Sequence, residues 1–170
     1  GLLTRALALA PDYDAARVAL WGACTAAGDH RAALAAVAPV TDASPFAIEA
    51  RFLAAMTHVH LREYARAFTL LEALHARAPS ALVLNNLGVV RLRLGTPSPD
   101  GGRPAWYFSR ARTLDPLDAD YLFNLGYAYW LDGDAQAAGY WLREAVRLAP
   151  TDAGAHALYA QVLQVRGQTA

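Results

Sequence analysis

The clearest pattern of apolar and polar positions lies between residues 119 and 150, and it predicts two helices joined by a short turn. On the first helix, expected over about residues 120–131, apolar positions recur at spacings of three and four, which marks one face: Leu122, Leu125, Gly126 and Tyr129. The second helix is expected over about residues 134–148, and its face holds Ala138, Leu142 and Ala145 before Pro150. Such a hairpin cannot bury its apolar face alone, so the rest of the chain should pack beside it.

This spacing, a Leu-Gly pair with a Tyr three residues on, then a small-residue stripe and a proline, resembles the tetratricopeptide repeat (TPR), a helical hairpin of about 34 residues. The resemblance covers the whole chain and is most specific around Leu87-Gly88 and Leu125-Gly126. It implies an all-α fold and one domain, a right-handed α-α superhelix of about ten helices, with four full repeats and a half-repeat at each end. The expected units are a half-repeat at residues 1–13, repeats at 14–47, 48–80, 81–118 and 119–152, and a half-repeat at 153–170.

Four departures from the repeat pattern predict local differences. Trp21 stands where a small residue is expected, so its hairpin must open or shift to admit the indole. Pro39 should end a helix near residue 38, because proline removes a backbone hydrogen bond and clashes with the preceding turn. Arg62 replaces the turn glycine. Residues 95–103 form an inserted loop rich in proline and glycine, followed by Pro104 in the first turn of the next helix.

Composition narrows the function classes. The 170 residues are 55% hydrophobic and 18% charged, which is typical of a folded chain. Fifteen basic residues, all arginine, balance fifteen acidic ones, and this bias indicates a GC-rich, bacterial genome. The sequence contains no block of basic residues, so it does not indicate a nucleic-acid partner. It also contains no apolar run long enough for membrane insertion. Because the chain opens inside a repeat, we interpret it as a fragment, with a cytoplasmic and a periplasmic location both left open.

Catalytic chemistry finds little support in the sequence, so we expect no enzyme, catalytic residue, cofactor or metal. Cys24, the single cysteine, occupies a core position on its helix and is interpreted as a small apolar residue. His58 and His60 lie two residues apart on a helix and therefore point in nearly opposite directions. His58 should be a packed histidine, and His60 could line the groove. No metalloprotease, nucleophile-elbow or phosphate-loop motif occurs.

Binding of a protein or peptide is the better prediction. In the repeat's register, positions next to the core stripe of each first helix face a concave groove. Aromatic and amide side chains gather there, as in many peptide sites. The predicted groove residues are Phe52, Met56, Asn85, Asn86, Arg93, Phe123, Asn124, Tyr127 and Trp130. In the competing interpretation, some of these aromatics only pack against the next repeat.

The resemblance therefore implies a non-catalytic interaction scaffold that captures a partner peptide or helix. The alternative is a regulatory or substrate-recruiting arm of a larger enzyme, or part of a secretion or pilus assembly protein. Some family members hold a chaperone's C-terminal carboxylate with Lys, Asn and Arg, but no cation occupies the matching positions, which are Val18, Gly22, Leu53, Leu82 and Asn86. The half-repeats also suggest head-to-tail self-association of the chain.

Overall fold

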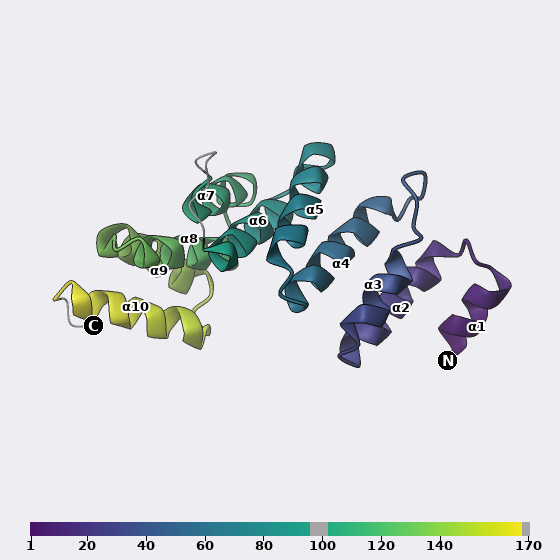
Figure 1. The fold of residues 1–170 in the computed structure, drawn as a ribbon. Helices are drawn as coiled ribbons and strands as arrows, with labels where there is room; N and C mark the ends of the chain where they lie inside the picture. Colours follow the sequence, from purple (N-terminus) through teal and green to yellow (C-terminus); the bar gives the residue numbers. More distant parts are fainter. Residues whose placement is uncertain (96–101, 168–170) are drawn as a thin grey trace. The chain divides into compact units, whose positions relative to one another are not determined.

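The computed structural model describes residues 1–95 and 102–167, and all regular structure in these residues is α-helical (Figure 1). The chain divides into two compact units, Gly1–Ala78 and Pro79–Ala170, and each is described by itself. The first unit contains α1 (Leu2–Leu9), α2 (Asp14–Ala26), α3 (His30–Val37), α4 (Ala47–His60) and α5 (Tyr64–Arg77). The second contains α6 (Ala81–Leu94), α7 (Pro104–Leu114), α8 (Ala119–Leu131), α9 (Ala135–Leu148) and α10 (Ala153–Val165).

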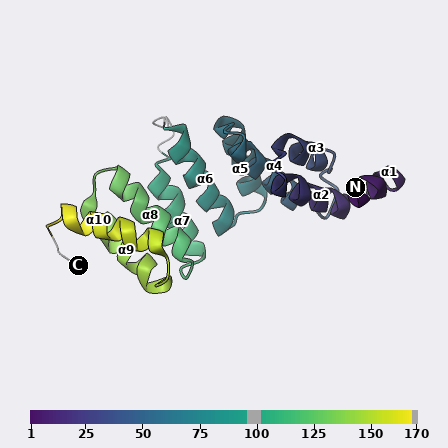
Figure 2. The same cartoon turned by 90° about the horizontal axis from the view of Figure 1, so that it is seen from below.

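In the second unit, consecutive helices form the hairpins α6–α7 and α8–α9, and α10 packs on α9 (Figure 2). Two glycines let the paired helices approach closely. A side chain at Gly88 would lie 2.6 Å from the ring of Phe108, and one at Gly126 would lie 2.7 Å from Leu142. Phe108 and Leu142 have no exposed surface. The hairpin predicted at about residues 120–148 is thus confirmed, and its core is formed by the predicted positions.

In the first unit, α2 pairs with α3 and α4 pairs with α5, while α1 packs on α2. Helix α3 has 8 residues, whereas α5 has 14. It ends at Val37, just before Pro39, as expected from the missing backbone donor and the clash with the preceding turn. The short helix leaves a space that Trp21 shares with Val40, since both pack in the cluster around Val37 and Ala50.

Trp21 makes a hydrogen bond in addition to its apolar packing. Its indole Nε1 donates a 2.7 Å hydrogen bond to Oγ1 of Thr57 on α4, and that hydroxyl donates to the carbonyl of Leu53 at 2.8 Å. Thr57 is 1% exposed, so both bonds satisfy a group that would otherwise be costly to bury. The indole is therefore accommodated against α4.

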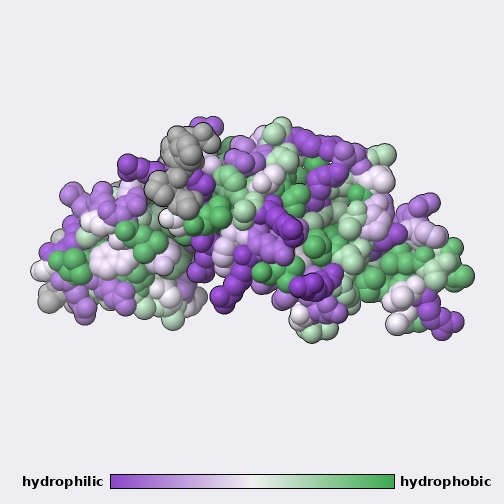
Figure 3. All heavy atoms as spheres, viewed as in Figure 1, coloured by the Kyte–Doolittle hydropathy of each residue, from purple (hydrophilic) through white to green (hydrophobic). Residues whose placement is uncertain are grey.

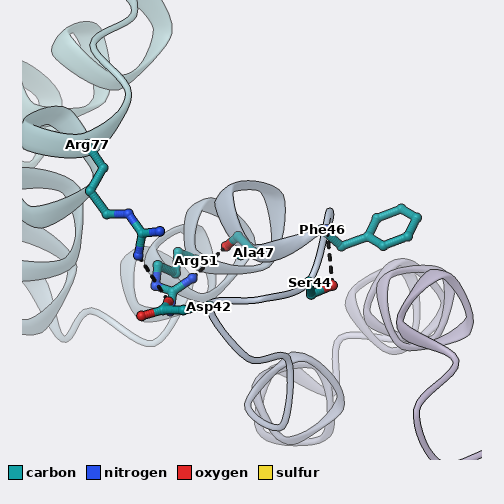
Figure 4. Close-up of polar contacts among 6 residues, drawn as sticks. All are labelled: Asp42, Ser44, Phe46, Ala47, Arg51 and Arg77. Atoms are coloured by element: carbon teal, nitrogen blue, oxygen red, sulfur yellow. Dashed lines mark hydrogen bonds and ion pairs between the residues drawn. The ribbon is translucent and has the colours of Figure 1, made fainter.

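The segment between α3 and α4 is irregular, and Asp42 ties it to two helices (Figure 4). The Asp42 carboxylate forms ion pairs with Arg51 on α4 and with Arg77 at the end of α5, the second at 3.0 Å. Asp42 is largely exposed, so each pair contributes little on its own. Together they fix the position of the segment that replaces the missing turns of α3.

The turns inside the hairpins adopt left-handed backbone conformations. Gly28 and Gly133 have φ of 76° and 81°, values that glycine accepts without steric cost. Arg62 occupies the same place after α4 with φ of 60°, the one positive φ outside glycine in residues 1–95 and 102–167. Arg62, which replaces the turn glycine, thus keeps the left-handed turn but adopts a backbone conformation that is strained for a residue with a side chain.

The inserted loop predicted at residues 95–103 lies mainly outside the described residues, which resume at Gly102. Its flanks behave as expected: Gly95 ends α6 with φ of 64°, and Pro104 begins α7. At the start of the chain, α1 has no buried residue, and Leu2 and Leu9 are 85% and 89% exposed. Figure 3 shows hydrophobic surface over this helix. The repeat boundaries, which no helix end defines by itself, stay a prediction.

Candidate functional site

The predicted binding residues of the second unit lie on its first-type helices, α6 and α8, which pack beside each other. Asn85 on α6 and Asn124 on α8 meet directly: Nδ2 of Asn124 donates a 2.9 Å hydrogen bond to Oδ1 of Asn85. Both side chains are half-buried. Each amide still has at least one N–H that this bond does not use. The two asparagines thus form a fixed polar pair between adjacent helices.

The aromatic residues of α8 divide between surface and core. Phe123 and Tyr127 lie one helical turn apart with parallel rings, 6.4 Å between centroids and 6° between planes. Tyr127 is 37% exposed. Phe123 and Trp130 are half-buried and pack against the cluster of Ala138, Leu142 and Val162. Tyr127 is therefore the aromatic ring most available to a partner, and the other two also support the fold.

The remaining predicted residues either have other surroundings in the second unit or belong to the first unit. Asn86 donates a 2.8 Å hydrogen bond to the carbonyl of Leu82, one turn back on its own helix. Arg93 is exposed near the end of α6. Phe52 and Met56 are half-buried on α4, which belongs to the first unit. Within the second unit, the candidate site therefore consists of the asparagine pair and the two parallel rings of α8.

The histidines show one predicted and one unpredicted arrangement. His58 is 8% exposed, as expected of a packed residue, and its Nδ1–H donates a 2.7 Å hydrogen bond to Glu63. That bond, followed by the one from Arg66, holds the pKa of the Glu63 carboxyl below its usual range. His60 stacks on His30 of α3 with centroids 4.8 Å apart and planes at 4°. This pair joins two hairpins, which sequence spacing did not indicate.

Metal binding gains no candidate in the described part of the chain. Residues 1–95 and 102–167 hold no group of three or more His, Cys, Asp or Glu side chains arranged to bind a metal. The stacked rings of His30 and His60 direct their nitrogens within parallel planes, so they do not converge on one ion. Cys24 is half-buried, a little more accessible than the core position predicted.

One pocket was missed by the sequence analysis altogether. It lies between α9 and α10, has a volume of about 300 Å³, and opens beside a second hollow of about 400 Å³. Gly139, which lines it, is the one signal the sequence contained, because a glycine inside a helical pattern often has a packing reason. The pocket residues are Gln136, Gly139, Tyr140, Arg143, Tyr159 and Arg166.

The helical hairpins agree with a known protein family. A family model described as tetratricopeptide repeat matches residues 26–81 and 105–153. The chain belongs to the tetratricopeptide repeat family. The all-α fold class of TPR hairpins expected from the sequence is thereby confirmed. A search of curated proteins returned no match.

Solved TPR structures share the fold at low sequence identity. A chain of MamA from Desulfovibrio magneticus, residue 41 to the end, matches with a TM-score of 0.78 at 18% identity, over 92% of this chain and 86% of that one. TTC0263, a thermophilic TPR protein of Thermus thermophilus, matches with a TM-score of 0.73 at 21% identity, over 91% and 84%. YrrB, a TPR protein with an unusual peptide-binding site, matches with 0.72 at 19%, over 98% and 84%. None of the described helices is both long and apolar enough to span a bilayer.

Proposed function

We propose that this chain is a non-catalytic interaction scaffold that captures a partner peptide on the face of α6 and α8. The observation that carries the proposal is the Asn85–Asn124 pair together with the exposed ring of Tyr127, three residues further along α8. The asparagine pair supplies amide groups at the boundary between two helices, and the ring supplies apolar area next to them. Membership of a family of interaction repeats supports the same interpretation.

The chemistry of a peptide backbone fits these groups. An extended segment presents N–H and C=O groups that need partners when they leave water. An asparagine amide can donate and accept at once, so the amides of Asn85 and Asn124 can satisfy such groups whatever the peptide's side chains are. Tyr127 can then bind one side chain of the segment, as buried tyrosines often do at interfaces. YrrB, which has a similar fold and a peptide-binding site, is a precedent for this kind of ligand.

A random-peptide display library, selected on the wild-type chain, tests this proposal and requires no assumption about the partner's sequence. The affinity of each enriched peptide is then measured by fluorescence anisotropy for three proteins: wild type, Tyr127→Ala and Trp106→Ala. Trp106 is the matched control, since it is also a large aromatic residue, 51% exposed, but it lies on the second-type helix α7. Circular dichroism confirms that each variant is folded.

The proposal expects a family of peptides whose affinity falls about 10- to 100-fold in Tyr127→Ala, the size of an interface hot spot, and stays near wild type in Trp106→Ala. Equal affinities of all enriched peptides for wild type and Tyr127→Ala would exclude the α6–α8 face as the site.

Self-association is a second proposed interaction, and the exposed leucines of α1 favour it. Leu2 and Leu9 are 85% and 89% exposed, and Val165 at the end of α10 is 68% exposed. A head-to-tail contact would cover α1 of one copy with α10 of another, and it would extend into open chains because it does not close on itself. Sedimentation velocity of wild type should then show mass that rises with concentration, and a Leu2→Glu, Leu9→Glu variant should remain a monomer. A wild-type chain that stays monomeric over the same range contradicts this.

A further inference from the structure

The pocket between α9 and α10 lies outside the α6–α8 face. It is lined by Gly139, whose lack of a side chain leaves room for Arg166. Helices α9 and α10 lie side by side (Figure 2). A Cβ at Gly139 would come within 2.7 Å of Nη1 of Arg166 and 3.5 Å of Val162. The guanidinium of Arg166 therefore lies so close to α9 that the Cβ of any other residue at position 139 would crowd it. This contact brings a cation from the residue that caps the C-terminus of α10 against α9.

The charges around the pocket leave it cationic. Arg166 forms no ion pair with any carboxylate in residues 1–95 and 102–167, and its side chain lines the pocket. The second arginine, Arg143, contacts Glu144 at 3.3 Å, but Glu144 also pairs with Arg147 at 2.9 Å. The hydrogen bond from Arg147 is the main reason that the pKa of Glu144 lies below its usual range. Glu144 thus pairs with two guanidinium groups, those of Arg143 and Arg147, and leaves the charge of Arg166 unbalanced.

The other pocket residues provide hydrogen bonds of the right kind for an anion. Gln136 has an amide that can donate, and Tyr140 and Tyr159 line the same pocket. Phenol hydroxyls and amide N–H groups donate to carboxylate oxygens, and guanidinium groups do so with added charge. The nearby Asp134 lines only the neighbouring hollow, and its Oδ1 accepts a hydrogen bond from the backbone N–H of Ala137. Its carboxylate is therefore engaged in capping α9.

A second hollow adjoins the cationic pocket. Tyr140 and Gln136 line both, and the aromatic ring of Trp141 lines the hollow together with Ala137 and the capping residue Asp134. The rings of Tyr140 and Trp141 meet edge to face at 4.7 Å, and the guanidinium of Arg112 lies 4.8 Å over the Trp141 ring. These contacts hold Trp141 in place. A ligand that uses both spaces needs an acidic group next to an apolar one.

We propose that this pocket binds an aspartate or glutamate side chain of an acidic peptide segment, with a neighbouring apolar side chain of that segment against Tyr140 and Trp141. The volume of about 300 Å³ lies at the small end of ligand pockets, so it admits a short part of a peptide and excludes a folded domain. Arg143 and Arg166 hold the carboxylate, and the aromatic hollow makes a peptide a better fit than a small inorganic anion. This site is independent of the α6–α8 face and its proposed ligand.

The test is peptide display selected in parallel on wild type and on the double variant Arg143→Gln, Arg166→Gln. Enriched sequences are then compared by anisotropy, each beside a copy in which glutamine or asparagine replaces every acidic residue. Arg110→Gln is the matched control, because Arg110 is an exposed arginine of the same unit that neither lines the pocket nor pairs with Glu144. Gly139→Ala is a second probe, since its methyl group displaces the Arg166 guanidinium without removing any charge.

We expect acidic peptides with an adjacent apolar residue to be enriched on wild type only. Their affinity should fall about 10- to 100-fold in the double variant and in the neutral peptide copies, as for a charge-assisted contact. Arg110→Gln should keep wild-type affinity, Gly139→Ala should weaken binding, and Tyr127→Ala should leave these peptides unaffected.

Three results would overturn the proposal. One is the absence of any acidic consensus on wild type, and another is equal enrichment on the double variant. The third is a site that inorganic phosphate fills while no acidic peptide is enriched. In that case the amide NMR signals of Gly139 and Tyr140 would shift with phosphate in wild type but not in the double variant, and the pocket would be a small-anion site.

Discussion

Substitution by alanine at two glycines inside helices of the second unit, Gly88 and Gly139, should change the stability of the protein in opposite directions. At Gly88, the added Cβ would lie 2.6, 2.8 and 2.9 Å from three carbons of the Phe108 ring. At Gly139, the nearest atom is the terminal Nη1 of Arg166 at 2.7 Å. The distances are alike, but the neighbours differ. Phe108 has no exposed surface and packs with Leu125, whereas Arg166 is exposed and flexible.

The size of each stability change depends on which neighbouring side chain must move to admit the new Cβ. Ordinary contacts between carbon atoms begin near 3.5 Å, so the Phe108 ring has to retreat by roughly 1 Å into a filled core. Overpacking of this kind costs about 2–3 kcal/mol, while alanine in a helix gains about 1 kcal/mol over glycine. Gly88→Ala should therefore lower the free energy of unfolding by about 1–2 kcal/mol. Gly139→Ala should raise it by up to about 1 kcal/mol, because Arg166 can swing into solvent.

Urea unfolding followed by circular dichroism measures both changes against wild type. The slope with urea should be similar in all three proteins, so that the midpoints report stability. A Gly88→Ala protein at least as stable as wild type would refute the close approach of α6 and α7. A destabilised Gly139→Ala protein would show that backbone or core, and not the exposed guanidinium, fills the space beside Gly139.

Three further predictions concern the first unit. Arg62→Gly should raise the free energy of unfolding by about 1 kcal/mol, because φ of 60° crowds any side chain; an unchanged thermal midpoint would contradict this. Trp21→Phe should lower it by about 1 kcal/mol, since it removes the donor to the buried Thr57 hydroxyl; equal urea midpoints would argue against that bond. The lowered pKa of Glu63, caused first by His58, adds stability that is present above the ordinary carboxyl range and lost as pH falls through the lowered pKa. The stability difference between wild type and Glu63→Gln should therefore shrink on acidification. A difference independent of pH would exclude a stabilising contribution from the ionised Glu63 carboxylate.

The hairpins could be predicted from the sequence because each helix buries one stripe and each turn has its own chemistry. Residues 120–131 were expected as a helix, and α8 spans Ala119–Leu131. The helix expected from about residue 134 begins at Ala135, with Asp134 capping it. A proline was enough to predict the short α3, since its effect on a helix is local. These features depend on neighbours within one or two turns.

The site could be predicted only in part, because its residues have competing uses. The repeat register placed Asn85 and Asn124 on one face, and they meet. The same register could not tell how far Phe123 and Trp130 would be used by the core around Leu142. Packing of α10 on α9 decides that, and it depends on distances that no periodicity contains. The stacking of two histidines from α3 and α4 was missed for the same reason.

Two residues of the α9–α10 pocket differ from the residues at the same places of the preceding repeat. At the place of Gly139, the preceding repeat has Ala105, which is 8% exposed and packs against Leu125 and Ala128. At the place of Arg166, it has Asp132, an acidic residue at the end of α8. A methyl group fills the space there, and the nearby charge is negative. Loss of the methyl and reversal of the charge occur together at α9 and α10, so the cationic pocket depends on residues that the preceding repeat of this chain does not share.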